Sequence, residues 1–155
     1  MSTWDEYKKT MAEPPTLFSA AKQNDVPLLE RLLCEGAAID ERDHRGYSAL
    51  MLATYTGNSE AFAFLLGRGA DVNSVDLAGN SILMGAAFKG HGAMVDALVA
   101  RGADLRSKNH AGLDALGFAT TFGRIEIADR LRALLGKGDR NEDATRGSDA
   151  APSHL

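Results

Sequence analysis

The sequence has little cysteine, little excess charge and no long apolar run, and each shortage excludes a class of protein. Cys34 is the single cysteine, so neither an intramolecular disulfide nor a cysteine-based metal cluster can form. The net charge of −4 gives no support to binding of nucleic acid or of an anionic membrane. Residues 1–16 are polar and charged, and no segment approaches the roughly 20 apolar residues of a membrane span. These shortages predict a cytoplasmic protein that has no nucleic-acid or membrane partner.

Glycine, by contrast, is plentiful, and it recurs at a fixed spacing. The chain contains 16 glycines, and a shift of 33 residues aligns several of them with one another. The aligned sets are Gly46, Gly79 and Gly112; Gly57, Gly90 and Gly123; and, with the same spacing, Leu50, Leu83 and Leu116, and Ala53, Ala86 and Ala119. A repeat of this length is typical of stacked supersecondary units rather than of an ordinary globular domain.

Each unit reads as a turn followed by two short helices. In the second unit, residues 43–46 form a polar turn, and a helix over residues 48–56 ends at Gly57. A second helix over residues 59–67 carries apolar residues at helical spacing. A Gly-Ala-Asp segment at residues 69–71 then leads into an extended loop.

These residues resemble the ankyrin repeat, whose unit carries a T-P-L-H-x-A signature. The corresponding segments are Ser48–Ala53, Ser81–Ala86 and Asp114–Ala119, although none keeps the proline and histidine of the signature. The resemblance implies an all-α fold, an α-solenoid of four ankyrin repeats with short β-hairpin loops. The predicted units are residues 13–42, 43–75, 76–108 and 109–136, between an N-terminal extension at 1–12 and a disordered tail at 137–155. In the extension, Trp4 or Tyr7 is a candidate to pack on the first repeat.

The first unit departs from the pattern as a terminal unit would. Asn24 stands where the other units have the glycine that ends the first helix, and Glu13 stands where they have the turn glycine. Terminal repeats need a more polar outer face, so the first and fourth units are predicted to be caps.

The sequence predicts no catalytic, metal or cofactor site. The histidines are dispersed: His44 and His110 lie in turns two units apart, His91 lies between two helices, and His154 lies in the tail. Cys34 is expected to be a buried or half-buried, inert thiol. Asp71 and Asp104 recur in successive loops, where we expect them to bond turn amides rather than a metal.

The family resemblance implies a protein partner, which binds the turn tips and the exposed side of the first helices on a concave face. The positions that match are His44, Arg45, Tyr47, Tyr55, Thr56, Leu77, Asn80, Phe88, Lys89, His110, Leu113, Thr121 and Phe122. Aromatic and apolar residues among them, next to arginine and lysine, are typical anchors of a protein interface. Two readings stay open: the aromatic residues form a binding stripe, or some turn inward over Gly85 and Gly117. Met51 and Met84 either extend the stripe or pack inside.

The sequence therefore predicts a monomeric, non-catalytic protein-binding module without a cofactor. Short stand-alone arrays of this kind are similar to small bacterial ankyrin-repeat proteins, which implies an accessory or inhibitor of an enzyme. The alternatives are a structural spacer without a discrete partner and an enzyme that uses Cys34.

Overall fold

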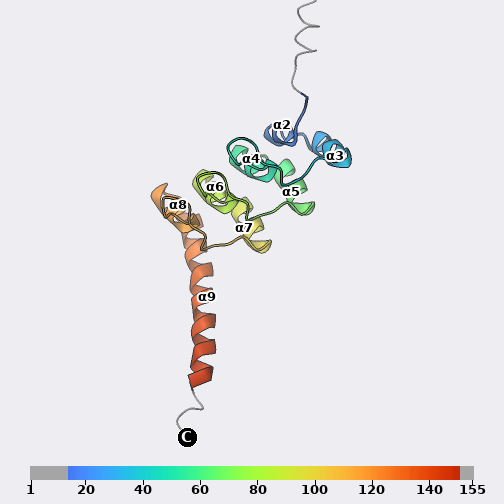
Figure 1. The fold of residues 1–155 in the computed structure, drawn as a ribbon. Coiled ribbons are helices and arrows are strands. Elements are labelled where there is room, and N and C mark those ends of the chain that lie inside the picture. The colour runs from blue at the N-terminus through green and yellow to red at the C-terminus, as the bar shows by residue number, and fades with distance from the viewer. Residues whose placement is uncertain (1–13, 151–155) are drawn as a thin grey trace, which may run out of the picture.

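The computed structural model describes residues 14–150, with side chains described for residues 14–137, and it consists of paired helices stacked in a row. The helices are α2 (Leu17–Lys22), α3 (Val26–Cys34), α4 (Ala49–Thr56), α5 (Ser59–Gly67), α6 (Ile82–Lys89), α7 (Gly92–Ala100), α8 (Ala115–Thr121) and α9 (Ile125–Ala150). The first helices of the pairs, α2, α4, α6 and α8, lie along one side of the stack, and α3, α5 and α7 lie along the other (Figure 1). The prediction of an all-α solenoid is confirmed for this part of the chain.

The first helix of each pair begins at a side chain that caps it. The hydroxyls of Ser48 and Ser81 accept hydrogen bonds from the backbone N–H of Met51 and Met84, at 3.2 Å in both cases. The Asp114 carboxylate accepts the corresponding bond from Gly117 N at 2.7 Å. These caps satisfy N–H groups that the helix itself leaves without a partner. The seven- and eight-residue helices α4, α6 and α8 therefore start at equivalent positions of the repeat.

The turns between pairs are short hairpins that contact one another. Isolated antiparallel bridges join Arg42 to Ser48 and Val75 to Ser81, as the predicted hairpin loops require. Gly46 has φ +83°, and a Cβ atom there would lie 2.9 Å from Leu77 N. Only glycine tolerates both the left-handed backbone and this close approach. The hairpins are therefore stacked, with Leu77 N donating to the Arg45 carbonyl at 3.2 Å.

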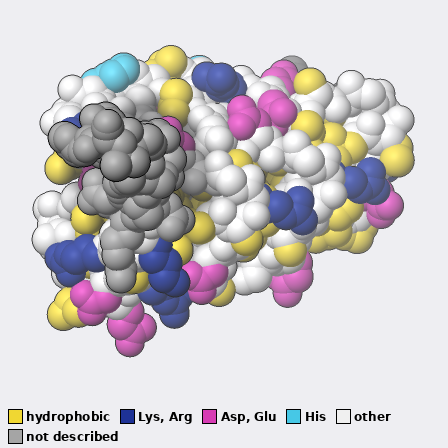
Figure 2. Space-filling model, turned by 90° about the horizontal axis from the view of Figure 1, so that it is seen from below, with side chains coloured by type: hydrophobic (Ala, Val, Ile, Leu, Met, Phe, Trp, Pro, Cys, Tyr) yellow, Lys and Arg dark blue, Asp and Glu magenta, His cyan; other side chains and the backbone are white. Residues whose placement is uncertain are grey.

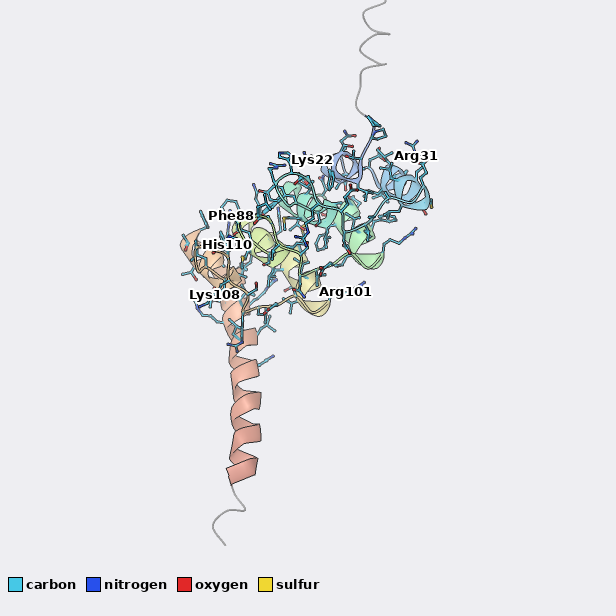
Figure 3. All side chains as sticks on the ribbon, in the orientation of Figure 1. Lys22, Arg31, Phe88, Arg101, Lys108 and His110 are labelled. Atoms are coloured by element: carbon cyan, nitrogen blue, oxygen red, sulfur yellow. The ribbon has the colours of Figure 1, made fainter. Side chains whose placement is uncertain are left out.

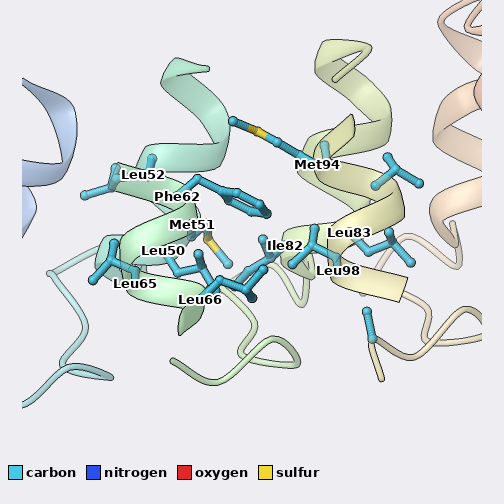
Figure 4. Close-up of a cluster of buried hydrophobic side chains, with 14 of the residues drawn as sticks. Leu50, Met51, Leu52, Phe62, Leu65, Leu66, Ile82, Leu83, Met94 and Leu98 are labelled. Atoms are coloured by element: carbon cyan, nitrogen blue, oxygen red, sulfur yellow. The ribbon is translucent and has the colours of Figure 1, made fainter. Parts of the chain in front are cut away.

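One continuous hydrophobic core runs through the stack. Its largest members come from both helices of each pair and include Leu50, Leu65, Leu83 and Leu98, all at most 1% exposed (Figure 4). Small residues such as Ala53 and Ala86 are fully buried where α4 and α6 pack together. Met51 and Met84 are also buried, so both pack inside, as the second of the two readings of these methionines has it.

Two asparagines link the first pair of helices to the second. Asn24 ends α2 with φ 56°, the left-handed conformation that glycine adopts in the other units. Its side-chain carbonyl accepts a hydrogen bond from Ala61 N at 2.9 Å. In return, the Asn58 side-chain amide donates to the carbonyls of Ala21 and Lys22, at 2.8 and 2.9 Å. The departure of Asn24 from the repeat pattern therefore preserves the helix end and adds a contact between units.

We expect Asn58→Ala to lower the free energy of unfolding by about 1–2 kcal/mol, because two carbonyls at the end of α2 lose their donor. Urea unfolding followed by circular dichroism at the helical band measures this loss. Asn73→Ala is a useful comparison, since the Asn73 side chain also bonds the next unit, donating to the Gly102 carbonyl at 3.3 Å and accepting from Asp104 N at 2.8 Å, but both bonds are exposed and their loss costs less. Equal stability of Asn58→Ala and the wild type would contradict this role of Asn58.

The C-terminal region differs from the sequence-based expectation. The predicted disordered tail begins at residue 137, whereas α9 continues as a helix to Ala150. The helix extends away from the stack (Figure 1). Residues 151–155 and the N-terminal extension, with Trp4 and Tyr7, lie outside the described residues. Among the described helices, none has both the length and the apolar character needed to cross a membrane.

Candidate functional site

The predicted binding residues lie on the side of the stack formed by the first helices and the hairpin turns. Figure 3 places Phe88 and His110 on this side and Arg31 and Arg101 on the side of the second helices. Seen from below, the stack shows basic and acidic side chains interspersed with apolar ones (Figure 2). That mixture is typical of an ordinary solvated surface. We therefore looked for a site on the side of the first helices, which carries the aromatic residues and is called the aromatic side.

A groove of about 240 Å³ lies on the aromatic side, between the second, third and fourth units. We call it the aromatic groove, and its lining consists of Tyr47, Tyr55, Asn80, Met84, Gly85, Phe88 and Phe118. Four of these side chains are aromatic, and they come from a hairpin turn and from α4, α6 and α8. The repeat thus brings together residues that are up to two units apart in the sequence.

Gly85 determines where the Tyr55 ring lies. A Cβ atom at position 85 would be 2.5 Å from the ring carbon Cε1 of Tyr55, closer than two such atoms can approach. The absent side chain therefore leaves a seat for the ring on the surface of α6. Tyr47 packs beside Tyr55 with ring centroids 5.6 Å apart and planes inclined at 57°. The two tyrosines form one wall of the aromatic groove.

Phe88 and Phe118 form the opposite wall, and Phe122 packs against both of them. The ring of Phe88 meets Phe122 edge-on with centroids 4.6 Å apart, and it meets Phe118 edge-on at 6.4 Å. Phe118 and Phe122 lie nearly parallel, 6.1 Å apart, since residues four positions apart share one face of a helix. Phe122 stays 47% exposed, although the other two rings are partly covered. Such edge-on and stacked pairs hold rings in fixed orientations.

The floor of the groove is a hydrogen-bonded network of polar side chains. Asn80 donates to the Asp76 carboxylate at 3.1 Å, and Asn109 donates to the Asn80 side-chain carbonyl at 2.8 Å. Asp76 is 8% exposed and also accepts the backbone N–H groups of Ala78 and Asn80, both at 2.9 Å. Because its acceptor sites are occupied within its own turn, the buried carboxylate is well compensated.

The equivalent carboxylate of the preceding turn, Asp43, is held in the same way. Burial raises its pKa, but backbone N–H bonds from Tyr47 and Arg45 lower it, as do the charges of Arg45 and His44, and the net result is a pKa below its ordinary value. Asp43 therefore stays ionised and fixes the hairpin that presents Arg45 and Tyr47. The guanidinium of Arg45 lies 4.5 Å from the centroid of the Tyr47 ring.

Burial, followed by the Asp76 charge and by Tyr47, raises the pKa of Tyr55 to about 12, and this shift predicts an alkaline transition. The neutral phenol is favoured in the folded state. Its contribution to stability is therefore present below the ordinary value of 10.0 and is lost as the pH rises from there to about 12. Ultraviolet titration of tyrosinate absorbance should show one late-ionising tyrosine, which is absent in Tyr55→Phe. Ionisation of all the tyrosines near pH 10 would show that Tyr55 is not held in this environment.

The structure brings only part of the predicted set together. Tyr47, Tyr55, Asn80 and Phe88 line the aromatic groove, and Phe122 adjoins it. The remaining predicted residues surround the groove or occupy the turn tips: His44, Arg45, Thr56, Leu77, Lys89, His110, Leu113 and Thr121. Leu77 is 71% exposed at its tip, whereas the His110 ring packs against Gly79 and Leu113 packs against Gly117. A role for these residues in binding stays a prediction.

Sequence reasoning missed Phe118 as a groove residue. Phe118 aligns with Gly85 in the 33-residue register, at the fifth position of the signature segment, where no binding residue was predicted. The four-residue spacing from Phe118 to Phe122 could have indicated it, because it places the two rings on the same face of the helix. Of the two open readings of the aromatic residues, the inward one holds for Tyr55, whose ring lies over Gly85 and lines the groove. The binding stripe stays a prediction.

The described residues contain no arrangement that indicates metal chemistry. No group of three or more histidine, cysteine or acidic side chains lies close enough to hold a metal ion in the part of the chain that the structure describes. Asp71 and Asp104 accept hydrogen bonds from the backbone N–H of Asn73 and Arg106, both at 2.9 Å, as expected for loop carboxylates. The expectation for Cys34 was wrong: its thiol is exposed, because the last residue of α3 lies off the face that buries Leu29.

Comparison with known proteins adds one finding. The family model for ankyrin repeats, in three copies, matches residues 17–109. No curated protein matches the chain at a significant level. The match covers the pairs α2–α3, α4–α5 and α6–α7, and the pair α8–α9, which supplies Phe118 to the groove, follows it.

Proposed function

Since the chain belongs to the ankyrin repeat family, whose members are generally protein–protein interaction modules, we propose that it is a non-catalytic module that binds a partner protein at the aromatic groove. The observation that carries this proposal is the cluster of tyrosine and phenylalanine rings in one groove, beside the exposed Phe122. Aromatic residues are enriched in binding hot spots because they bury a large apolar area with few rotatable bonds.

Preorganisation supports the same site. The hairpin turns are joined to one another, with Leu77 N on the Arg45 carbonyl and His110 N on the Ala78 carbonyl, at 3.2 and 3.0 Å. The rings are held by edge-on contacts and by the seat at Gly85. A surface that is ordered before the partner arrives loses little conformational entropy on binding.

Within this proposal, the partner is an enzyme that the chain assists or inhibits, as the similarity to small bacterial ankyrin-repeat proteins implies. The monomeric state and the cytoplasmic compartment also stay predictions. A spacer without a discrete partner would not need a cluster of partly exposed rings, so the binding module is the better account of this surface.

Affinity capture from a lysate of the native cells tests the proposal. The bait is the wild-type chain, compared with the double variant Lys89→Ala/Phe122→Ala, which changes two exposed side chains and leaves the buried core intact. The matched control is Arg68→Ala/Ile125→Ala, which removes one exposed cation and one apolar side chain outside the groove. We expect a protein that is held by the wild type and the control and lost by the groove variant. Equal capture by all three chains would place the binding surface elsewhere.

A further inference from the structure

The rim of the aromatic groove carries two cations that lie over aromatic rings. The side chain of Arg45 is 48% exposed next to Tyr47, and the ammonium of Lys89 lies 5.5 Å from the centroid of the Phe88 ring. Arg45 also lies 3.6 Å from the Asp43 carboxylate, whose side chain is 12% exposed, and this ion pair offsets part of the Arg45 charge, so Lys89 carries the less compensated charge of the two. These positive groups stand on opposite walls of the groove, in a chain whose net charge is −4.

The carboxylates near the groove are held within their own turns or helix, below the rim. Asp43 and Asp76 each direct one oxygen to two backbone N–H groups of their own turn. Asp114 accepts the cap bond of α8. Their oxygens are therefore bonded to backbone N–H groups, whereas the ammonium of Lys89 is exposed and carries its charge on a flexible stem. A partner meets positive charge at the rim before it meets the rings.

The interior of the groove, unlike its rim, is unfavourable for an anionic group. Its walls are rings, and it is also lined by Asn80, whose side-chain amide donates to the buried Asp76 carboxylate. An anionic group placed inside would be desolvated next to that carboxylate, which is unfavourable. A cation inside would meet Arg45 and Lys89, which already occupy ring faces. An uncharged, bulky side chain is therefore the group that suits the interior.

The size of the groove agrees with one such side chain. Its volume of about 240 Å³ lies below the roughly 300–1,000 Å³ that is typical of pockets for small organic ligands. The groove therefore has room for a single large side chain from a partner.

We propose that the partner docks through a peptide segment in which one aromatic or large aliphatic side chain enters the aromatic groove and flanking carboxylates face Arg45 and Lys89. This inference rests on the proposed function and specifies the chemistry of the partner. The apolar anchor supplies most of the affinity, and the flanking charges supply orientation and discrimination against basic segments.

Fluorescence anisotropy with defined peptides tests this inference. The probes are fluorescein-labelled nonapeptides with a central phenylalanine between flanks of glutamate, of glutamine or of lysine, and a fourth peptide with glutamate flanks and a central alanine. We expect the glutamate–phenylalanine probe to bind at least about tenfold more tightly than the lysine-flanked probe, with the glutamine-flanked probe between them. The difference should shrink as salt rises, because rim charges are screened. The central alanine should abolish measurable binding.

Two charge variants make the test specific to the rim. In Lys89→Glu we expect the preference for glutamate flanks over lysine flanks to fall at least about fivefold. Lys137→Glu, which makes the same charge change on an exposed residue of α9, should keep the preference of the wild type. The inference is overturned if the flanks make no difference, if both variants behave alike, or if no phenylalanine probe binds. In that last case, a cellular partner that is still lost by Lys89→Ala/Phe122→Ala would show that the proposed function holds and that only the peptide chemistry is wrong.

Discussion

Leu83→Ala should lower the free energy of unfolding by about 2–5 kcal/mol, a large part of the stability of a domain of this size. Leu83 is 1% exposed in α6, the first helix of the third unit, and α6 packs against α4, α7 and α8. The substitution leaves a cavity at the centre of the stack, where the neighbouring helices cannot close completely. Because each repeat is stabilised by its neighbours, both interfaces of the third unit weaken together.

Urea unfolding followed by helical circular dichroism provides the measurement for Leu83→Ala. Leu77→Ala is the matched control, because it removes the same atoms from a side chain that is 71% exposed, and it should change stability by less than about 0.5 kcal/mol. A loss below about 1 kcal/mol for Leu83→Ala would contradict the continuous core described above.

Gly85→Ala should weaken binding at the aromatic groove while leaving the stability of the fold nearly unchanged. The new Cβ atom would lie 2.5 Å from Tyr55 Cε1, so the ring must leave its seat. The displaced ring loses its contact with α6, and alanine, which favours the helix over glycine by about 1 kcal/mol, offsets part of that loss. We therefore expect a stability within about 1 kcal/mol of the wild type and an affinity for the captured partner that falls at least about tenfold.

The control for Gly85→Ala is Gly67→Ala. Position 67 lies at the end of α5, and a Cβ atom there would meet nothing within 4 Å. This variant makes the same substitution in a helix and leaves the aromatic groove untouched, so it should bind the partner as the wild type does. Isothermal titration with the purified partner measures all three affinities. If Gly85→Ala binds as tightly as Gly67→Ala, the position of the Tyr55 ring is irrelevant to binding.

The fold was predictable because the repeat imposes the same local chemistry several times. Gly57 and Gly90 end helices in the left-handed conformation, and Ser48 and Ser81 begin them. Agreement between helix signals and the 33-residue period therefore predicts paired, stacked helices. The extent of α9 was not predictable in this way, since residues 137–150 lack the apolar periodicity on which the argument relied.

The candidate site was only partly predictable, because a groove depends on contacts between units. The period places Tyr47, Tyr55 and Phe88 on one side of the stack, and the structure puts them in one groove. The period alone does not reveal that the Tyr55 ring of the preceding unit packs on Gly85, or that Phe118 of the following unit contacts Phe88. Met84 shows the same limit, since it lines the groove while being 1% exposed.

The central claim is that the partner binds at the aromatic groove, and backbone amide NMR tests it most directly. The ¹⁵N-labelled chain is titrated with the captured partner, and the shift of each amide signal is mapped on the structure. The account predicts the largest shifts at Tyr55, Gly85, Phe88 and Phe118, with little change in α3, α5 and α7. Shifts concentrated in α5 and α7, with the groove amides unmoved, would contradict it.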